Sequence, residues 1–148
     1  MVFSFTINNK SQTHESLNPS KEETCKAVCG IFGIFNHSEA SNLTYLGLYA
    51  LQHRGQESAG IVSSDSRQLY HYRQMGLVSE IFTQDILKRL PGKSAIGHVR
   101  YSTAGWSELK NAQPFVVDYY KGSLAIAHNG NLSNAPLIKS DVESTGSI

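Results

Sequence analysis

The 148-residue sequence has only two cysteines, Cys25 and Cys29, and no apolar run long enough to cross a bilayer. Two cysteines are too few for a disulfide framework, and further Cys or His residues at zinc-ligand spacing are lacking. Thirteen lysines and arginines nearly balance twelve acidic residues, without a basic cluster. We therefore expect a reducing compartment, no nucleic-acid partner and no membrane partner.

The first 28 residues are polar and match no targeting signal. They lack the basic start and apolar core of a secretory signal, and they contain acidic residues, which a mitochondrial transit peptide avoids. We expect a cytoplasmic protein in which residues 1–28 are a disordered leader or propeptide. Residues 29–148 are then one domain, long enough to bury a core.

Apolar patterns after residue 28 predict strands alternating with helices. The expected strands cover residues 29–35, 59–64, 67–74, 94–102 and two segments within 115–130. The expected helices cover residues 43–53, capped by Ser41 or Asn42, and 77–90, with a last one starting at the N-cap Asn134. Short turns between neighbouring strands indicate antiparallel sheets and an α+β fold, with helices covering sheet faces.

Cys29 stands at the head of the first expected strand and is the candidate nucleophile. A thiol needs a base beside it, because the thiolate is the reactive form. If the Val28–Cys29 bond is cut, the free α-amine of Cys29 supplies that base, with a reference pKa of roughly 7.7–8.0. The alternative is that Cys29 is a small buried apolar residue at a strand start, and the stretch alone favours this alternative.

Three further segments contain polar residues at strand ends. Arg100 follows an apolar strand and has the planar fork that grips a carboxylate, although a surface Arg in a salt bridge is the interpretation that this segment favours in isolation. The Asn129 amide and the Gly130 N–H lie where a strand passes into a helix and could hold an oxyanion, or could form an ordinary turn. Arg54 either pairs with Glu57 or braces a site from below.

Six segments together resemble one known family. They read "CGIFGIF", "LQHRGQESAGI", "MGLVSEIF", "GHVRYSTAG", "NAQPF" and "AHNGNLSNA", in the family's order and approximate spacing. The chain from Cys29 onward resembles the class II glutamine amidotransferase domain, an N-terminal-nucleophile hydrolase, and most narrowly that of the amidophosphoribosyltransferases. Relatives that use a sugar-phosphate acceptor would predict "RGYDSAG" and "HTRWATHG" instead.

The resemblance implies a four-layer αββα sandwich and the hydrolysis of glutamine to glutamate and ammonia. Cys29 would attack the glutamine amide, and Asn129 with Gly130 would form the oxyanion hole. Arg100 would bind the α-carboxylate of glutamine, and Arg54 would support the Cys29 end of the site. Tyr101, Ser102 and Thr103 would begin a substrate-binding loop that reaches about Gln113 and closes over glutamine.

The resemblance also implies parts outside this chain. The match reaches Ile148, so we expect a domain incomplete at its C-terminus, without a following Asp that helps to bind glutamine. The phosphoribosyltransferase domain would use the ammonia with phosphoribosylpyrophosphate to make 5-phosphoribosylamine in purine biosynthesis. Mg²⁺ is expected only in that domain, with no cofactor or metal in this chain, and the full-length family is expected to form homo-oligomers. An inactive fragment, an interaction module and a sugar-phosphate amidotransferase remain alternatives.

Overall fold

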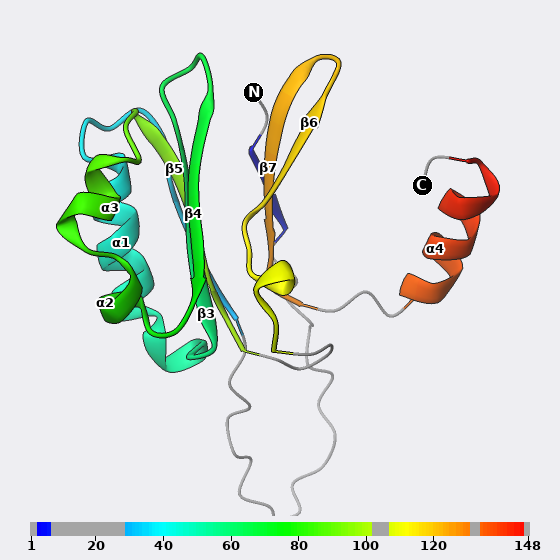
Figure 1. Ribbon diagram of the computed structural model, residues 1–148, viewed down its shortest axis with the longest axis horizontal. Helices are drawn as coiled ribbons and strands as arrows, with labels where there is room; N and C mark the ends of the chain where they lie inside the picture. The colour runs from blue at the N-terminus through cyan, green and yellow to red at the C-terminus, as the bar shows by residue number, and fades with distance from the viewer. Residues whose placement is uncertain (1–2, 7–28, 102–106, 131–133, 147–148) are drawn as a thin grey trace, which may run out of the picture.

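The computed structural model describes residues 3–6, 29–101, 107–130 and 134–146. These residues form two stacked β-sheets with helices on the outside, in the order helix, sheet, sheet, helix (Figure 1). This arrangement confirms the predicted αββα sandwich, and the strands are paired mainly in antiparallel fashion, as expected.

The first sheet has the strand order β2-β5-β3-β4 and is antiparallel throughout. Its strands are β2 (Gly30–Ile34), β5 (Ser94–Arg100), β3 (Ser58–Ser64) and β4 (Leu69–Met75). Gly30 pairs with Val99, and Ser58 pairs with Arg100. The start of β2, the end of β5 and the start of β3 therefore meet at one edge of this sheet.

The second sheet has the order β1-β7-β6. β6 (Phe115–Tyr119) and β7 (Gly122–His128) form the predicted antiparallel hairpin, and Gly122 supplies the positive φ of 124° at its turn. β1 (Phe3–Thr6) pairs in parallel with β7. The sequence predicts disorder here, whereas the structure places these four residues in a strand. The rest of the expected leader, residues 7–28, lies outside the described residues.

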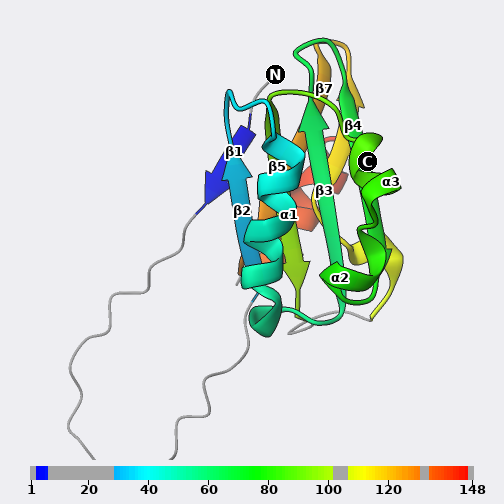
Figure 2. The same cartoon turned by 90° about the vertical axis from the view of Figure 1, so that its left-hand side faces the viewer.

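Helices α1, α2 and α3 cover the outer face of the first sheet, as Figure 2 shows from that side. α1 (Ala40–Ala50) begins directly after Glu39, so the predicted caps Ser41 and Asn42 are wrong. Both lie inside the first turn, where the Ser41 hydroxyl instead donates to the Leu90 carbonyl at 2.5 Å. The short 3-10 helix η1 (Gln52–Arg54) continues the chain towards β3.

The single helix expected over residues 77–90 is two helices, α2 (Val78–Ile81) and α3 (Gln84–Lys88). The chain leaves helical geometry at Phe82, whose side chain is buried in the core, and Thr83 then caps α3 by accepting from the Ile86 amide at 3.3 Å. α4 (Ala135–Ser144) follows Asn134 as predicted, but without a side-chain capping bond. It lies beyond the second sheet and buries no residue (Figure 1).

Two apolar clusters hold the layers together. One packs the helices against the first sheet and includes Leu48, Ile61 and Val99. The other lies between the sheets and includes Val62 and Ile96. Because successive strand residues face opposite sides, Ile61 and its neighbour Val62 serve different clusters. Full burial of such a side chain contributes about 1.5–3 kcal/mol, so β3 and β5 are fixed from both faces. None of the described helices meets the length and hydropathy that a membrane span requires.

Candidate active site

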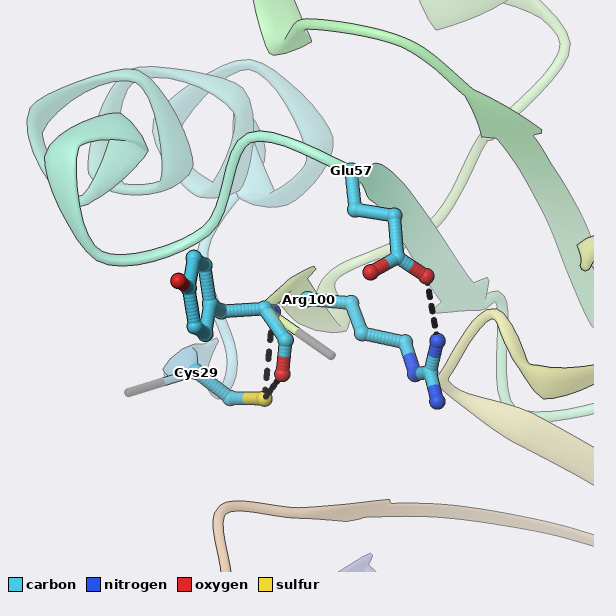
Figure 3. A network of polar contacts seen from close by, with 4 residues as sticks. Cys29, Glu57 and Arg100 are labelled. Carbon is cyan, nitrogen blue, oxygen red and sulfur yellow. Dashed lines mark hydrogen bonds and ion pairs between the residues drawn. The ribbon is translucent and has the colours of Figure 1, made fainter. Parts of the chain in front are cut away.

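The site lies at the sheet edge where β2 begins and β5 ends. Cys29 immediately precedes β2, and Arg100 is the last residue of β5. Since Gly30 pairs with Val99, the next residues outward, Cys29 and Arg100, are neighbours across the two strands. Figure 3 shows Cys29 on one side of Arg100 and Glu57 on the other. The structure thus brings together residues that are about 70 positions apart in the sequence.

The thiol of Cys29 is free, half-buried and held by the backbone of Tyr101. The Tyr101 N–H donates to Cys29 Sγ at 3.4 Å, and Sγ lies 3.5 Å from the Tyr101 carbonyl oxygen, to which the thiol can donate. These contacts place the sulfur directly next to the end of β5 (Figure 3). The Tyr101 side chain itself is 45% exposed.

The segment after α1 supports the Cys29 backbone. Arg54 Nε donates to the Cys29 carbonyl oxygen at 3.4 Å. Gly55 packs so closely on β5 that a Cβ atom there would lie 2.6 Å from the Val99 carbonyl carbon. A glycine is needed at this point because backbone meets backbone. These contacts give Arg54 the supporting position expected from the sequence.

Arg100 forms an ion pair with Glu57, between Nη1 and Oε1. The sequence left open whether Glu57 pairs with Arg54, and the structure assigns it to Arg100 instead. Both side chains are largely buried, with 9% and 15% of their surfaces exposed. The guanidinium of Arg100 is therefore held by a charge-assisted hydrogen bond to Glu57.

Asn129 and Gly130 follow β7 at the same end of the sandwich. His98 Nε2, on β5, lies 3.2 Å from the carbonyl oxygen of His128, the last residue of β7, and so links the two sheets near their ends. The His128 amide also donates to Gln113 Oε1 at 2.6 Å. Gly130 has φ of 148°, a conformation that favours glycine. The oxyanion pair predicted from the sequence thus begins next to the strand that carries Arg100.

His98 is fully buried and is kept neutral by its surroundings. Burial is the main cause that lowers its pKa from 6.5 to about 4; the hydrogen bond to the His128 carbonyl raises the pKa, and the charge of Arg100 adds a smaller lowering effect. Nε2 therefore donates to that carbonyl, and Nδ1 has no hydrogen-bond partner among the described residues. His98 is thus a packed, neutral side chain that links the two sheets.

Three predicted features are not placed by the structure. Ser102 and Thr103 lie outside the described residues, as do residues 104–106 of the loop that they would begin, whereas residues 107–113 are described. No group of three or more His, Cys, Asp and Glu side chains that might hold a metal occurs within residues 3–6, 29–101, 107–130 and 134–146. Sequence reasoning missed the pairing of Glu57 with Arg100 and the contact of Gln113 with β7, because both join distant segments.

A family model described as glutamine amidotransferases class-II matches residues 63–146. Among curated proteins, the chain is 50% identical to amidophosphoribosyltransferase 2, chloroplastic, of Arabidopsis thaliana, over 99% of this chain and 26% of that protein. It is 51% identical to amidophosphoribosyltransferase of Bacillus subtilis, over 81% of this chain and 25% of that protein. The chain thus spans about a quarter of the length of these relatives.

Solved structures give the same result. The chain matches the B. subtilis glutamine phosphoribosylpyrophosphate amidotransferase complexed with ADP and GMP, with a TM-score of 0.72 and 49% identity over 80% of this chain and 25% of that chain. It also matches a structure titled as the allosteric regulatory enzyme of purine biosynthesis, with a TM-score of 0.75 and 50% identity, over 80% of this chain and 26% of that chain.

Proposed function

Because this chain belongs to the class II glutamine amidotransferases, we propose that it is the glutamine-hydrolysing part of an amidophosphoribosyltransferase. The observation that carries the proposal is the contact between Cys29 Sγ and the Tyr101 amide, which places a thiol next to the strand end that carries Arg100. A nucleophile next to a carboxylate-binding group suits a substrate with an α-carboxylate at one end and a reactive amide at the other.

The reaction starts with a cut between Val28 and Cys29, which frees the α-amine. This amine takes the thiol proton, and Sγ attacks the side-chain amide carbon of glutamine. The amide oxygen becomes an oxyanion, held by the Asn129 side chain and the Gly130 N–H. The C–N bond breaks, the amine returns the proton to the departing nitrogen, and ammonia leaves a glutamyl thioester on Cys29.

Water completes the cycle. The α-amine takes a proton from water, the resulting hydroxide attacks the thioester carbon, and the C–S bond breaks to release glutamate. The protonated α-amine then returns its proton to the departing thiolate of Cys29. Arg100 binds the α-carboxylate throughout, while Arg54 holds the Cys29 carbonyl and thereby the direction of the sulfur. Tyr101, Ser102 and Thr103 begin the loop that closes over the substrate.

The named relatives suggest what becomes of the ammonia. We assign its acceptor, phosphoribosylpyrophosphate, to a further domain of a longer homo-oligomeric protein, which makes 5-phosphoribosylamine for purine synthesis with Mg²⁺ bound there. A cytoplasmic location belongs to the same proposal, although the named relatives from Arabidopsis thaliana are chloroplastic.

The test follows Cys29 by mass spectrometry. The full chain is purified, its intact mass is measured, and it is treated with 6-diazo-5-oxo-L-norleucine, a glutamine-shaped electrophile. We expect loss of residues 1–28, one adduct on Cys29 and glutaminase activity, with adduct and activity both absent in Cys29→Ser. Processed, folded protein that leaves Cys29 unlabelled and does not hydrolyse glutamine would contradict the proposal.

A further inference from the structure

Glu57 touches the site in two ways, and neither contact belongs to the reaction just described. Its carboxylate pairs with the Arg100 guanidinium, and its backbone N–H donates to the Arg100 carbonyl oxygen at 3.1 Å. Its own carbonyl oxygen accepts from the Gly76 amide at 2.9 Å. Glu57 is thus fixed between the ends of β4 and β5 before its side chain reaches Arg100.

The backbone contact continues to the nucleophile. The Arg100 carbonyl oxygen and the Tyr101 N–H belong to one peptide group, which is trans, so they point in opposite directions. One side accepts from the Glu57 N–H, and the other donates to Cys29 Sγ. A chain of hydrogen bonds therefore runs from Glu57 through this peptide group to the sulfur, and such chains strengthen their members.

The side-chain contact sets the direction of the guanidinium. Arg100 is long and flexible, and without a partner its fork would sample several orientations. The pair with Glu57 engages Nη1, and in Figure 3 the other terminal nitrogen points away from Glu57. A largely buried ion pair contributes little net stability, because desolvation offsets most of the attraction. Its place beside the nucleophile therefore suggests orientation of Arg100.

We propose that Glu57 is the positioning residue of the glutamine site: its carboxylate orients Arg100 for the substrate carboxylate, and its amide fixes the peptide group that holds Cys29 Sγ. The inference rests on the proposed function and deepens it, because it divides the two tasks between side chain and backbone. Glu57→Gln removes only the side-chain charge. It leaves the amide, and so the thiol contact, in place.

Two reagents separate these tasks. 6-Diazo-5-oxo-L-norleucine carries the α-carboxylate that Arg100 binds, whereas iodoacetamide reaches the same thiol without one. In E57Q we expect labelling of Cys29 by the diazo reagent at low concentration to slow about tenfold, the effect of losing one charge-assisted hydrogen bond. Labelling by iodoacetamide is expected to stay within twofold of wild type, and the KM for glutamine to rise with little change in kcat.

The matched control is Glu143→Gln on α4, where an exposed glutamate loses its pair with Lys139. It is expected to label like wild type with both reagents. Glu57→Asp keeps the charge on a shorter side chain and gives a second measurement if E57Q does not fold. Its rate of labelling by the diazo reagent is expected to lie between the rates of wild type and E57Q. If E57Q does not fold, E57D is expected to label more slowly than wild type with the diazo reagent only.

The outcomes are distinguishable from failure of the proposed function. A wild-type chain that reacts no faster with the diazo reagent than with iodoacetamide has no glutamine site, and both proposals fall. If wild type labels faster with the diazo reagent than with iodoacetamide, and E57Q or E57D keeps this preference in full, only the role of Glu57 is overturned. Equal slowing with both reagents also overturns it, since a general structural role would act on the thiol itself.

Discussion

His98 makes a pH-dependent contribution to stability that follows from its burial. Its imidazole is fully enclosed between the two sheets, and burial lowers its pKa from 6.5 to about 4. In the unfolded chain the ring regains its usual pKa of about 6.5. Between these two pKa values the unfolded chain binds a proton that the folded chain does not bind, so lowering the pH favours unfolding.

The size and direction follow from linkage. Above pH 6.5 the ring is neutral in both states, and it makes no pH-dependent contribution to the free energy of unfolding. As the pH falls from 6.5 towards 4, only the unfolded state gains the proton, and the free energy of unfolding decreases. The decrease amounts to about 2 kcal/mol at pH 5 and about 3 kcal/mol near pH 4, a large part of the 5–15 kcal/mol typical of a domain.

The assay compares wild type with His98→Gln. The glutamine amide nitrogen takes about the place of Nε2 and can still donate to the His128 carbonyl, but it does not titrate. Urea unfolding of both proteins at pH 7.5, 6, 5 and 4.5 gives the difference in unfolding free energy at each pH. We expect wild type to lose about 2 kcal/mol relative to H98Q between pH 7.5 and pH 5.

The matched control is His71→Gln, at an exposed position on β4. It is expected to follow wild type across the whole range. A difference between wild type and H98Q that stays constant from pH 7.5 to pH 5 would refute the reasoning, because it would show that the folded protein accommodates the charged ring.

Two glycines and one arginine give further predictions. Gly60→Ala places a Cβ 2.2 Å from the Gln113 carbonyl oxygen, so we expect about 1–3 kcal/mol lower stability in urea and a weakened contact between Gln113 and β7. Gly55→Ala meets the β5 backbone and is expected to lower the melting temperature and slow labelling of Cys29. Arg54→Met loses the bond to the Cys29 carbonyl, and we expect both thiol reagents to slow equally, unlike E57Q.

The strands could be predicted well from the sequence, because the buried strands β3 and β5 are apolar on both faces and flanked by polar residues. The helices were harder. The apolar spacing over residues 77–90 fits one helix, yet the chain breaks at Phe82 and Thr83. Phe82 is drawn into the core, and the Thr83 hydroxyl can cap a new helix, so packing and local capping together override the periodicity.

The positions of Cys29 and Arg100 at strand ends were also foreseeable, since Cys29 directly precedes one apolar run and Arg100 directly ends another. Their partners were not. Glu57 lies three residues from Arg54, and this spacing favours a local ion pair in the sequence. Residues 52–54 instead form a short 3-10 helix, and the chain is extended at Gly55, which leads Glu57 to the end of β5. The long-range pair with Arg100 replaces the local one for this reason.

The strand order explains why the site exists at all. Sequence neighbours usually pair, which would place β2 against β3. In the structure β5 lies between them, in register with both. With antiparallel neighbours on each side, the end of β5 coincides with the starts of β2 and β3, and so Arg100 meets Cys29 on one flank and Glu57 on the other. A sheet with β2 and β3 paired directly would separate the nucleophile from the residue that positions its carboxylate clamp. The chemistry therefore depends more on the insertion of β5 between β2 and β3 than on any local motif. This insertion brings together residues about 70 positions apart in the sequence.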